Sequence, residues 1–395
     1  MLNKILPLAS FLISLPSTRD NKKALNDVLD LALKQVDDFT IERFEKDGYP
    51  SALVYQGKSR PKNFKVILNA HLDVVSAKVE QFKPYEKDGK LFGRGVIDMK
   101  GAAAVLILVF KEMAKKVSYP LALQLVTDEE IGGFCGTKYQ IEKGVRADFV
   151  LAGEPTDFGI NNKAKGIIWA KIKTKGKSTH GAYPWMGKNA LWMAKKILDK
   201  IEKQYPVPKK EAWQTTFNLA KIETSNQTFN KVPDEATISF DIRYIPEEFY
   251  LTNNQKKQSK LHYQKILKQV QDDKNGDFYN NKRRDFLIKK IKKIIGNLGE
   301  MEILLFEPPQ FTDEKNFYVL KLKEAVKKFL NRSPKIIVKH GGSDIRHFNQ
   351  VGCQGVTFGP VGGDLHGDNE WVEIKSLERY YQIVLEFLGD LKGKI

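Results

Sequence analysis

The sequence has few cysteines and no long apolar run. Its two cysteines, Cys135 and Cys353, lie far apart among 395 residues and lack C-x-x-C spacing. Neither a disulfide framework nor a cysteine metal site is therefore indicated, and a reducing cytoplasmic setting is predicted. The apolar run at residues 6–15 follows a single cation, Lys4, and precedes no A-x-A cleavage site, so it does not read as a signal peptide. No stretch reaches the roughly 18 apolar residues of a membrane span, and we predict no membrane partner.

The chain also lacks the charge pattern of a nucleic-acid-binding protein, although it is basic. Lys and Arg total 65 against 48 Asp and Glu, which gives a net charge of +17. Most of this excess is lysine scattered along the chain, and no nucleic-acid-binding motif occurs. The densest basic run, at residues 282–293, also carries Leu and Ile at helical spacing, which indicates an amphipathic helix with a solvated basic face. We therefore predict no nucleic-acid partner.

Apolar segments alternate between strand and helix patterns over residues 41–156. The clearest helix is GAAAVLILVFKEMAKK, which begins at Gly101. This alternation predicts an α/β domain with a mostly parallel sheet flanked by helices. The same pattern resumes at residue 311, so we expect a discontinuous domain made of residues 1–165 and 311–395, which would hold the functional site.

Residues 166–310 have a different pattern and are expected to form a separate inserted domain. Their apolar segments follow the order strand, helix, strand, strand, helix, strand, which predicts a ferredoxin-like α+β fold. Within them, residues 251–281 are polar and rich in Gln, Asn and Lys, and we predict that they are disordered.

Histidine and acidic side chains stand at the ends of the predicted strands. The apolar run KVILNAHLD ends at a histidine and an aspartate, and later predicted strands and helix starts also carry acidic residues at their ends. The candidates are His71, Asp73, Asp98, Glu129, Glu130 and Glu154, and GGDLHGDNEWV adds His366 near the C-terminus. Taken singly, each is better explained as a helix cap or a hydrogen-bonded strand end. Because ligands bind beyond the carboxyl ends of parallel strands, the set together predicts one site.

The residue types in this set favour a divalent metal centre. Two histidines with several carboxylates and no cysteine suit Zn²⁺, Mn²⁺ or Co²⁺, with zinc expected first. Two ions are expected, with Asp98 bridging them at the separation of about 3.5–4 Å typical of such pairs. Since Glu129 and Glu130 are adjacent, one is expected to bind metal and the other to act as a base toward water. This division suits hydrolysis.

Five segments of the chain resemble the motifs of the M20 metallopeptidases and their deacylase relatives. The motifs are AHLDVV, DGKLFGRGVIDMKG, TDEEIGG, AGEPT and DLHGDNEWV, and the resemblance covers nearly the whole chain. It implies that His71 and Glu154 hold one metal and that Asp98 is shared. The second metal would be held by Glu130 and His366.

The same resemblance assigns further roles. Asp73 would orient His71, and Glu129 would be the catalytic base. His180, in KSTHGAYPW, is similar to a histidine that stabilises the oxyanion, often across a dimer interface. The inserted domain would then be a lid and dimerisation domain, so a homodimer is expected.

Four residues resemble substrate-contacting positions of the family. They are Asn230, Arg243, Ser343 and Arg346. For Arg243, a salt bridge facing solvent is an equal alternative. The residues before His366 depart from the threonine-containing sequence typical of the desuccinylases, whereas the AGEPT form favours deacylases and carboxypeptidases over dipeptidases.

The resemblance implies a hydrolase that cleaves an amide bond of an N-acyl amino acid or a small peptide. A succinyl-diaminopimelate desuccinylase is the leading hypothesis, and an acetylornithine deacetylase or a carboxypeptidase of the same family is the alternative. A non-catalytic protein that binds acidic ligands is the rival of another class. Such a protein is expected to have lost at least one member of the catalytic set, and every member is present.

Overall fold

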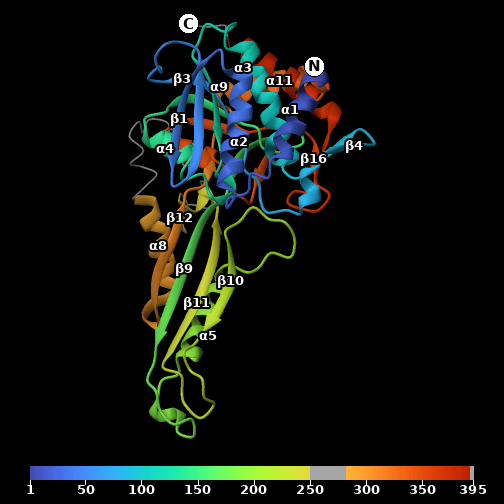
Figure 1. Ribbon diagram of the computed structural model, residues 1–395. Coiled ribbons are helices and arrows are strands. Elements are labelled where there is room, and N and C mark those ends of the chain that lie inside the picture. Colours follow the sequence, from blue (N-terminus) through green and yellow to red (C-terminus); the bar gives the residue numbers. More distant parts are fainter. Residues whose placement is uncertain (250–281, 392–395) are drawn as a thin grey trace. The chain divides into compact units, whose positions relative to one another are not determined.

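The computed structural model describes residues 1–249 and 282–391, which divide into two compact units (Figure 1). The first unit comprises the described residues of Met1–Lys163, Phe311–Val338 and Ser343–Ile395, and the second those of Ala164–Gln310 and Lys339–Gly342. The insertion predicted to be disordered, residues 251–281, lies outside the described residues. No helix within the described ranges is long and apolar enough to cross a membrane.

The first unit is built on a 9-stranded sheet with the order β1-β2-β6-β3-β7-β15-β8-β13, in which β14 also pairs with β8. Its strands are β1 (Thr40–Lys46), β2 (Tyr49–Tyr55), β3 (Phe64–His71), β6 (Leu121–Val126), β7 (Ala147–Ala152), β8 (Ile160–Ala164), β13 (Gln310–Phe311), β14 (Ile336–Lys339) and β15 (Gln354–Thr357). The central strands β6, β3, β7 and β15 run parallel, whereas β1 pairs antiparallel with β2, β2 with β6, and β8 with β15. The predicted α/β class is confirmed, and the antiparallel strands make the sheet mixed.

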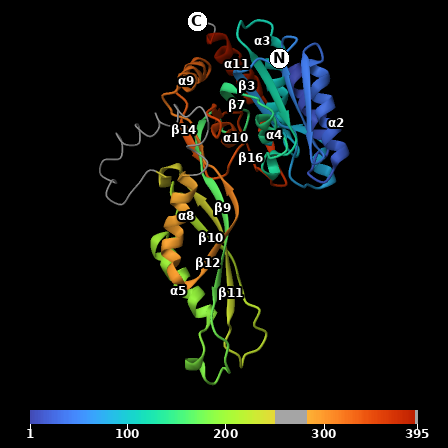
Figure 2. The ribbon, with the colours of Figure 1, turned by 90° about the vertical axis from the view of Figure 1, so that its left-hand side faces the viewer.

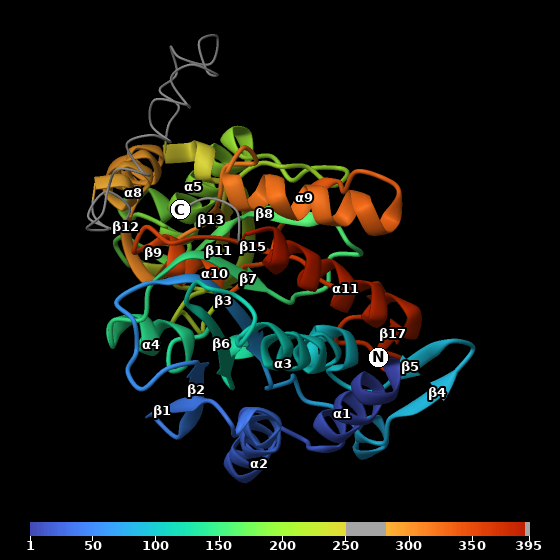
Figure 3. The same ribbon diagram turned by 90° about the horizontal axis from the view of Figure 1, so that it is seen from above.

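Helices cover both faces of this sheet (Figure 3). One face lies under α1 (Leu2–Ser14), α2 (Lys22–Leu33), α3 (Gly101–Met113), α9 (Phe317–Leu330) and α11 (Ile374–Asp390), and the other under α4 (Thr137–Glu142) and α10 (Ile345–Asn349). Strand β3 is buried on both faces of the sheet, because Val66 and Leu68 pack in the larger hydrophobic core and Ile67 packs in the smaller one. A strand buried on both faces needs a continuous apolar run, as this one has.

A small second sheet in the first unit joins two distant segments. It has the order β16-β17-β5-β4, with β4 (Tyr85–Lys87), β5 (Lys90–Phe92), β16 (Gly362–Gly363) and β17 (Trp371–Glu373). Strand β17 pairs antiparallel with β5, Trp371 opposite Phe92. Asp98 follows β5 and His366 lies between β16 and β17, so this pairing brings both loops to the same part of the unit.

The second unit has the predicted ferredoxin-like arrangement. Its elements are β9 (Gly166–Lys175), α5 (Ala190–Gln204), β10 (Thr216–Glu223), β11 (Glu235–Tyr244), α8 (Lys282–Ile295) and β12 (Glu300–Glu307). The sheet order is β10-β11-β9-β12 and every pairing is antiparallel. Figure 2 shows α5 and α8 along one face of this sheet. The alternating side chains of β9 that face the helices, such as Ile168 and Ile172, are buried.

Candidate metal centre

The parallel strands of the first unit deliver the candidate ligands to one edge of the sheet. His71 is the last residue of β3, Glu154 follows β7 by two residues, and the adjacent Glu129 and Glu130 follow β6. Because neighbouring parallel strands end at the same edge, these side chains converge. Asp98 reaches the same edge from the segment Val96–Lys100, which leads into α3 and in which the backbone of Asp98 is not helical.

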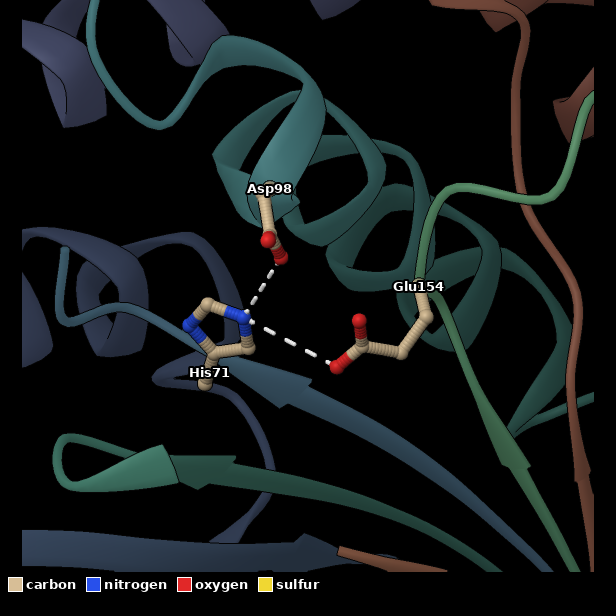
Figure 4. A group of neighbouring side chains, drawn as sticks. All are labelled: His71, Asp98 and Glu154. Atoms are coloured by element: carbon tan, nitrogen blue, oxygen red, sulfur yellow. Dashed lines mark hydrogen bonds and ion pairs between the residues drawn. The ribbon is translucent and has the colours of Figure 1, made fainter. Parts of the chain in front are cut away.

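His71, Asp98 and Glu154 form the first group (Figure 4). The Nε2 atom of His71 lies 3.1 Å from Oδ1 of Asp98 and 3.8 Å from Oε1 of Glu154. One donor atom from each residue falls within 4.8 Å of the other two. His71 is only 1% exposed, and the two carboxylic residues are 9% exposed. The group is therefore a small, largely buried cluster of nitrogen and oxygen donors.

Asp98, Glu130 and His366 form the second group. Nε2 of His366 lies 3.4 Å from Oδ2 of Asp98 and 3.3 Å from Oε1 of Glu130. The two groups thus share Asp98, which turns one carboxylate oxygen toward each histidine. A carboxylate shared in this way is the usual bridge of a two-metal site.

The electrostatics of the cluster fit divalent cations. Burial lowers the pKa of His71, but hydrogen bonds to Asp73 and Asp98 raise it well above its usual value. Hydrogen bonds to Asp98 and Glu130 raise the pKa of His366 to about 10. Oε1 of Glu130 is buried and lies 3.3 Å from Nε2 of His366. These shifts report an excess of negative charge, and an all nitrogen and oxygen donor set suits Zn²⁺, Mn²⁺ or Co²⁺.

Glu129 stands apart from both ligand groups. Neither group of candidate ligands among the described residues includes it. Burial, together with the nearby carboxylate of Glu154, raises the pKa of Glu129 well above its usual value. A carboxyl group with this environment holds a proton more readily than an ordinary glutamate, as a residue that accepts and returns protons must.

Asp73 connects His71 to the turn that carries the two glutamates. Nδ1–H of His71 donates to the main-chain oxygen of Asp73 at 3.0 Å. With its proton on Nδ1, a neutral ring would turn the lone pair of Nε2, which lies 3.1 Å from Oδ1 of Asp98, toward the cluster, where it could bind a cation. The carboxylate of Asp73 accepts the main-chain N–H groups of Glu129 and Glu130 at 3.2 and 3.0 Å. Asp73 therefore fixes a histidine ring and an acidic turn together.

Two of the predicted substrate contacts lie near α10, behind the acidic turn. Arg346 donates to the main-chain oxygens of Gly132 and Ser343 at 2.6 and 2.9 Å. His347 donates from Nε2 to the same Gly132 oxygen at 2.9 Å. Ser343 and Arg346 are each 4% exposed. These bonds hold the residue that ends the acidic turn, while contact of either side chain with substrate stays a prediction.

The remaining predicted site residues belong to the second unit. His180 lies in the loop between β9 and α5, and the next residue, Gly181, donates its N–H to the main-chain oxygen of Asn230 at 2.6 Å. His180 is exposed, and its Nδ1 accepts the N–H of Ala182. Arg243 is half-buried on β11 and makes two hydrogen bonds to Asp241, at 2.9 and 3.0 Å. The ion pair anticipated as the alternative for Arg243 is thus present, and the catalytic and substrate-binding roles of this set stay predictions.

Sequence reasoning missed a buried ion pair next to the second group. Arg94 and Glu370 are 3% and 1% exposed and lie 2.7 Å apart. In the sequence, Arg94 lies four residues from Asp98 and Glu370 four residues from His366, and this closeness to predicted ligands was the available sign that the two residues matter. An arginine and a glutamate at such positions read as ordinary surface charges until their burial is known.

A family comparison identifies the chain. The model of peptidase family M20/M25/M40 matches residues 67–390. The chain belongs to this family. The protein is therefore a metal-dependent hydrolase, and the fold and hydrolase class expected from the motifs are confirmed.

Individual relatives agree with this assignment. The chain is 29% identical over 358 residues to a succinyl-diaminopimelate desuccinylase of Rickettsia bellii, covering 84% of this chain and 82% of the relative. A solved tripeptidase structure from Staphylococcus aureus matches with a TM-score of 0.73 and 19% identity, covering 100% of this chain and 99% of that one. An M20 family metallo-carboxypeptidase from Sulfolobus solfataricus matches with a TM-score of 0.68 and 18% identity, covering 98% of each chain. At these identities, the two structures establish the fold alone.

Proposed function

We propose that this M20 protein is a two-metal amidohydrolase that cleaves an N-acyl amino acid, with succinyl-diaminopimelate as the leading substrate. The observation that carries the two-metal part is the pair of ligand groups that share Asp98. The desuccinylase relative, 29% identical over most of both chains, supports the choice of substrate.

The ligand roles follow from the two groups. His71, Asp98 and Glu154 would hold one cation, and Asp98, Glu130 and His366 would hold the other, with zinc expected and cobalt or manganese as alternatives. Bound there, two cations would supply Lewis-acid chemistry, lowering the pKa of a bound water molecule and polarising the scissile carbonyl. Asp73 keeps the His71 ring in the orientation that presents Nε2.

Glu129 is the proposed general base and acid. It lies beside a ligand, outside both groups, in surroundings that raise its pKa. Its carboxylate takes a proton from the attacking water as the oxygen bonds to the amide carbon. The same group then returns that proton to the nitrogen as the carbon–nitrogen bond breaks, which releases a carboxylate and an amine. Its main-chain N–H, held by Asp73, fixes the start of the side chain.

The second unit is proposed to act as the lid and dimerisation domain, spanning residues 166–310 between the catalytic segments 1–165 and 311–395. His180 would stabilise the oxyanion that forms on the carbonyl oxygen, from the same chain or from the partner of a homodimer. Asn230 and Arg243 would contact the substrate, together with Ser343 and Arg346. Two of the five N–H groups of the Arg243 guanidinium bind Asp241, so a substrate carboxylate would contact the other N–H groups.

A second candidate is an acetylornithine deacetylase or a carboxypeptidase of the same family. One feature favours it, namely that residues 360–365 (PVGGDL) lack the threonine-containing sequence typical of desuccinylases. The chemistry at the two ligand groups would be the same. Only the acyl or amino-acid part of the substrate would differ.

A substrate panel tests the proposal. Purified protein loaded with Zn²⁺, Co²⁺ or Mn²⁺ is assayed against succinyl-diaminopimelate, acetylornithine and small dipeptides, with the Glu129→Gln variant as a control for contaminating hydrolases. We expect the highest kcat/KM for succinyl-diaminopimelate. A higher value for another substrate on the panel would reassign the substrate, and hydrolysis of none by a metal-loaded protein would overturn the activity.

A further inference from the structure

Two loops that carry metal-ligand candidates meet at one buried ion pair. Arg94 precedes Asp98 by four residues, and Glu370 follows His366 by four. The pair is 2.7 Å long, and the Arg94 and Glu370 side chains are 3% and 0% exposed. Taking two charges out of water is costly unless hydrogen bonds satisfy both groups. The further partners of this pair are therefore informative.

Glu370 is hydrogen-bonded mainly to the backbone that leads to Asp98. Its Oε2 atom accepts the N–H of Gly95 at 2.9 Å as well as the Arg94 guanidinium. Its Oε1 atom accepts the N–H of Ile97 at 3.0 Å and that of Asp98 at 3.3 Å. Three main-chain N–H groups within residues 95–98 thus donate to one carboxylate. This arrangement sets the path of the chain into the shared ligand.

Arg94 makes the matching contacts on the other loop. Its second terminal nitrogen donates to the main-chain oxygens of His366 and Gly367 at 3.0 and 3.1 Å. The side chain of His366 is 48% exposed, so packing does little to fix its direction. Its backbone has a φ of 60°, in the left-handed region that most residues avoid. Holding its carbonyl is therefore an effective way to hold its ring.

We propose that the Arg94–Glu370 ion pair positions Asp98 and His366 relative to each other and so sets the affinity of the second metal position. The proposal rests on the two-metal function above. Arg94 and Glu370 are positioning residues, because they act through the backbone of two ligands. Of the ligands at the first metal position, only Asp98 is held by this ion pair, since His71 ends β3 and Glu154 follows β7 by two residues. The second position depends on it through two of its three ligands.

The chain offers a test variant and a matched control. Glu370→Gln keeps the size of the side chain but replaces one acceptor oxygen by an NH2 group, which faces either the Arg94 side or the N–H groups of the turn. The matched control is Asp368→Asn, which removes the 2.6 Å ion pair between Lys78 and Asp368 on the loop that carries His366. Unlike the Arg94–Glu370 pair, this ion pair is exposed, with the side chain of Lys78 68% and that of Asp368 64% exposed. Arg94→Lys retains a charge opposite Glu370 but cannot also reach both carbonyl oxygens of the His366 loop with a fixed planar fork.

The experiment measures binding of Zn²⁺ to metal-stripped full-length protein by titration calorimetry, with circular dichroism to establish the folded fraction. Wild-type protein is expected to bind two ions. Glu370→Gln is expected to bind one ion nearly as wild type and the other about 10- to 100-fold more weakly, the usual effect of losing an outer-shell partner. Asp368→Asn is expected to bind both ions within a few-fold of wild type.

Several outcomes would overturn the inference. Folded Glu370→Gln that binds both ions like wild type would do so, because a merely structural pair lowers thermal stability without changing the affinity of the folded protein. If Glu370→Gln does not fold, Arg94→Lys decides, and unchanged affinity for both ions would overturn the proposal. Wild-type protein that binds fewer than two ions would instead overturn the two-metal function, and this inference with it.

Discussion

Replacing Glu129 by glutamine removes one carboxylate charge from the centre and is expected to leave the metal ligands in place. Glu129 belongs to neither ligand group, whereas Glu130 places Oε1 only 3.3 Å from the imidazole of His366. The N–H groups of both residues remain anchored on Asp73 in either variant. Glu129→Gln therefore tests proton transfer, and Glu130→Gln tests metal binding at the same turn.

The expected magnitudes differ for the two variants. Loss of general acid–base catalysis lowers kcat by about 10²- to 10⁴-fold, equivalent to roughly 3–5 kcal/mol in the barrier. Glu129→Gln should show this loss with metal affinity within a few-fold of wild type. Glu130→Gln should weaken one metal by at least the roughly 10- to 100-fold seen on losing outer-shell partners. The assay pairs single-turnover hydrolysis with metal content after dialysis, and equal metal loss in both variants would refute the role assignment.

Three further predictions concern other parts of the chain. His180→Ala should lower kcat by about 10²- to 10³-fold if it stabilises the oxyanion, and mixing it with Glu129→Gln protein should restore activity only if His180 acts across a dimer interface. Gly133→Ala should lower the free energy of unfolding in urea by more than about 1 kcal/mol, because φ at Gly133 is +66° and an added Cβ would lie 2.0 Å from Oδ1 of Asp344. Gly389→Ala is the control, because a Cβ there meets no atom within 4 Å. Leu68→Ala should cost about 2–5 kcal/mol, because Leu68 is fully buried, whereas exposed Leu320→Ala should change stability by about 0.5 kcal/mol or less.

The sequence was most informative where a pattern had one physical explanation. A buried apolar run such as β3 has no packing reason to end in an imidazole, and the structure does bring His71 close to Asp98 and Glu154. In the second unit, β11 alternates buried and less buried side chains along its whole length. That period-2 pattern, together with the order of the elements, is sufficient to predict a ferredoxin-like sheet.

Long-range features could not be predicted. Arg94 and Glu370 are 276 residues apart, and their closeness in sequence to predicted ligands does not indicate that the two side chains will be buried against each other. The peptide bond between Asp98 and Met99 is cis, which sequence does not indicate where proline is absent. Arg346 matched a substrate-binding motif, yet its hydrogen bonds to main-chain oxygens depend on the fold placing α10 behind the acidic turn.

The central claim is that two cations bind on either side of Asp98. Crystals of the protein grown with Zn²⁺ and measured at the zinc absorption edge test it directly, because anomalous difference density locates the ions independently of the protein coordinates. We expect two peaks about 3.5–4 Å apart, one among His71, Asp98 and Glu154 and the other among Asp98, Glu130 and His366. A single peak at full occupancy, or ions bound away from Asp98, would contradict the account.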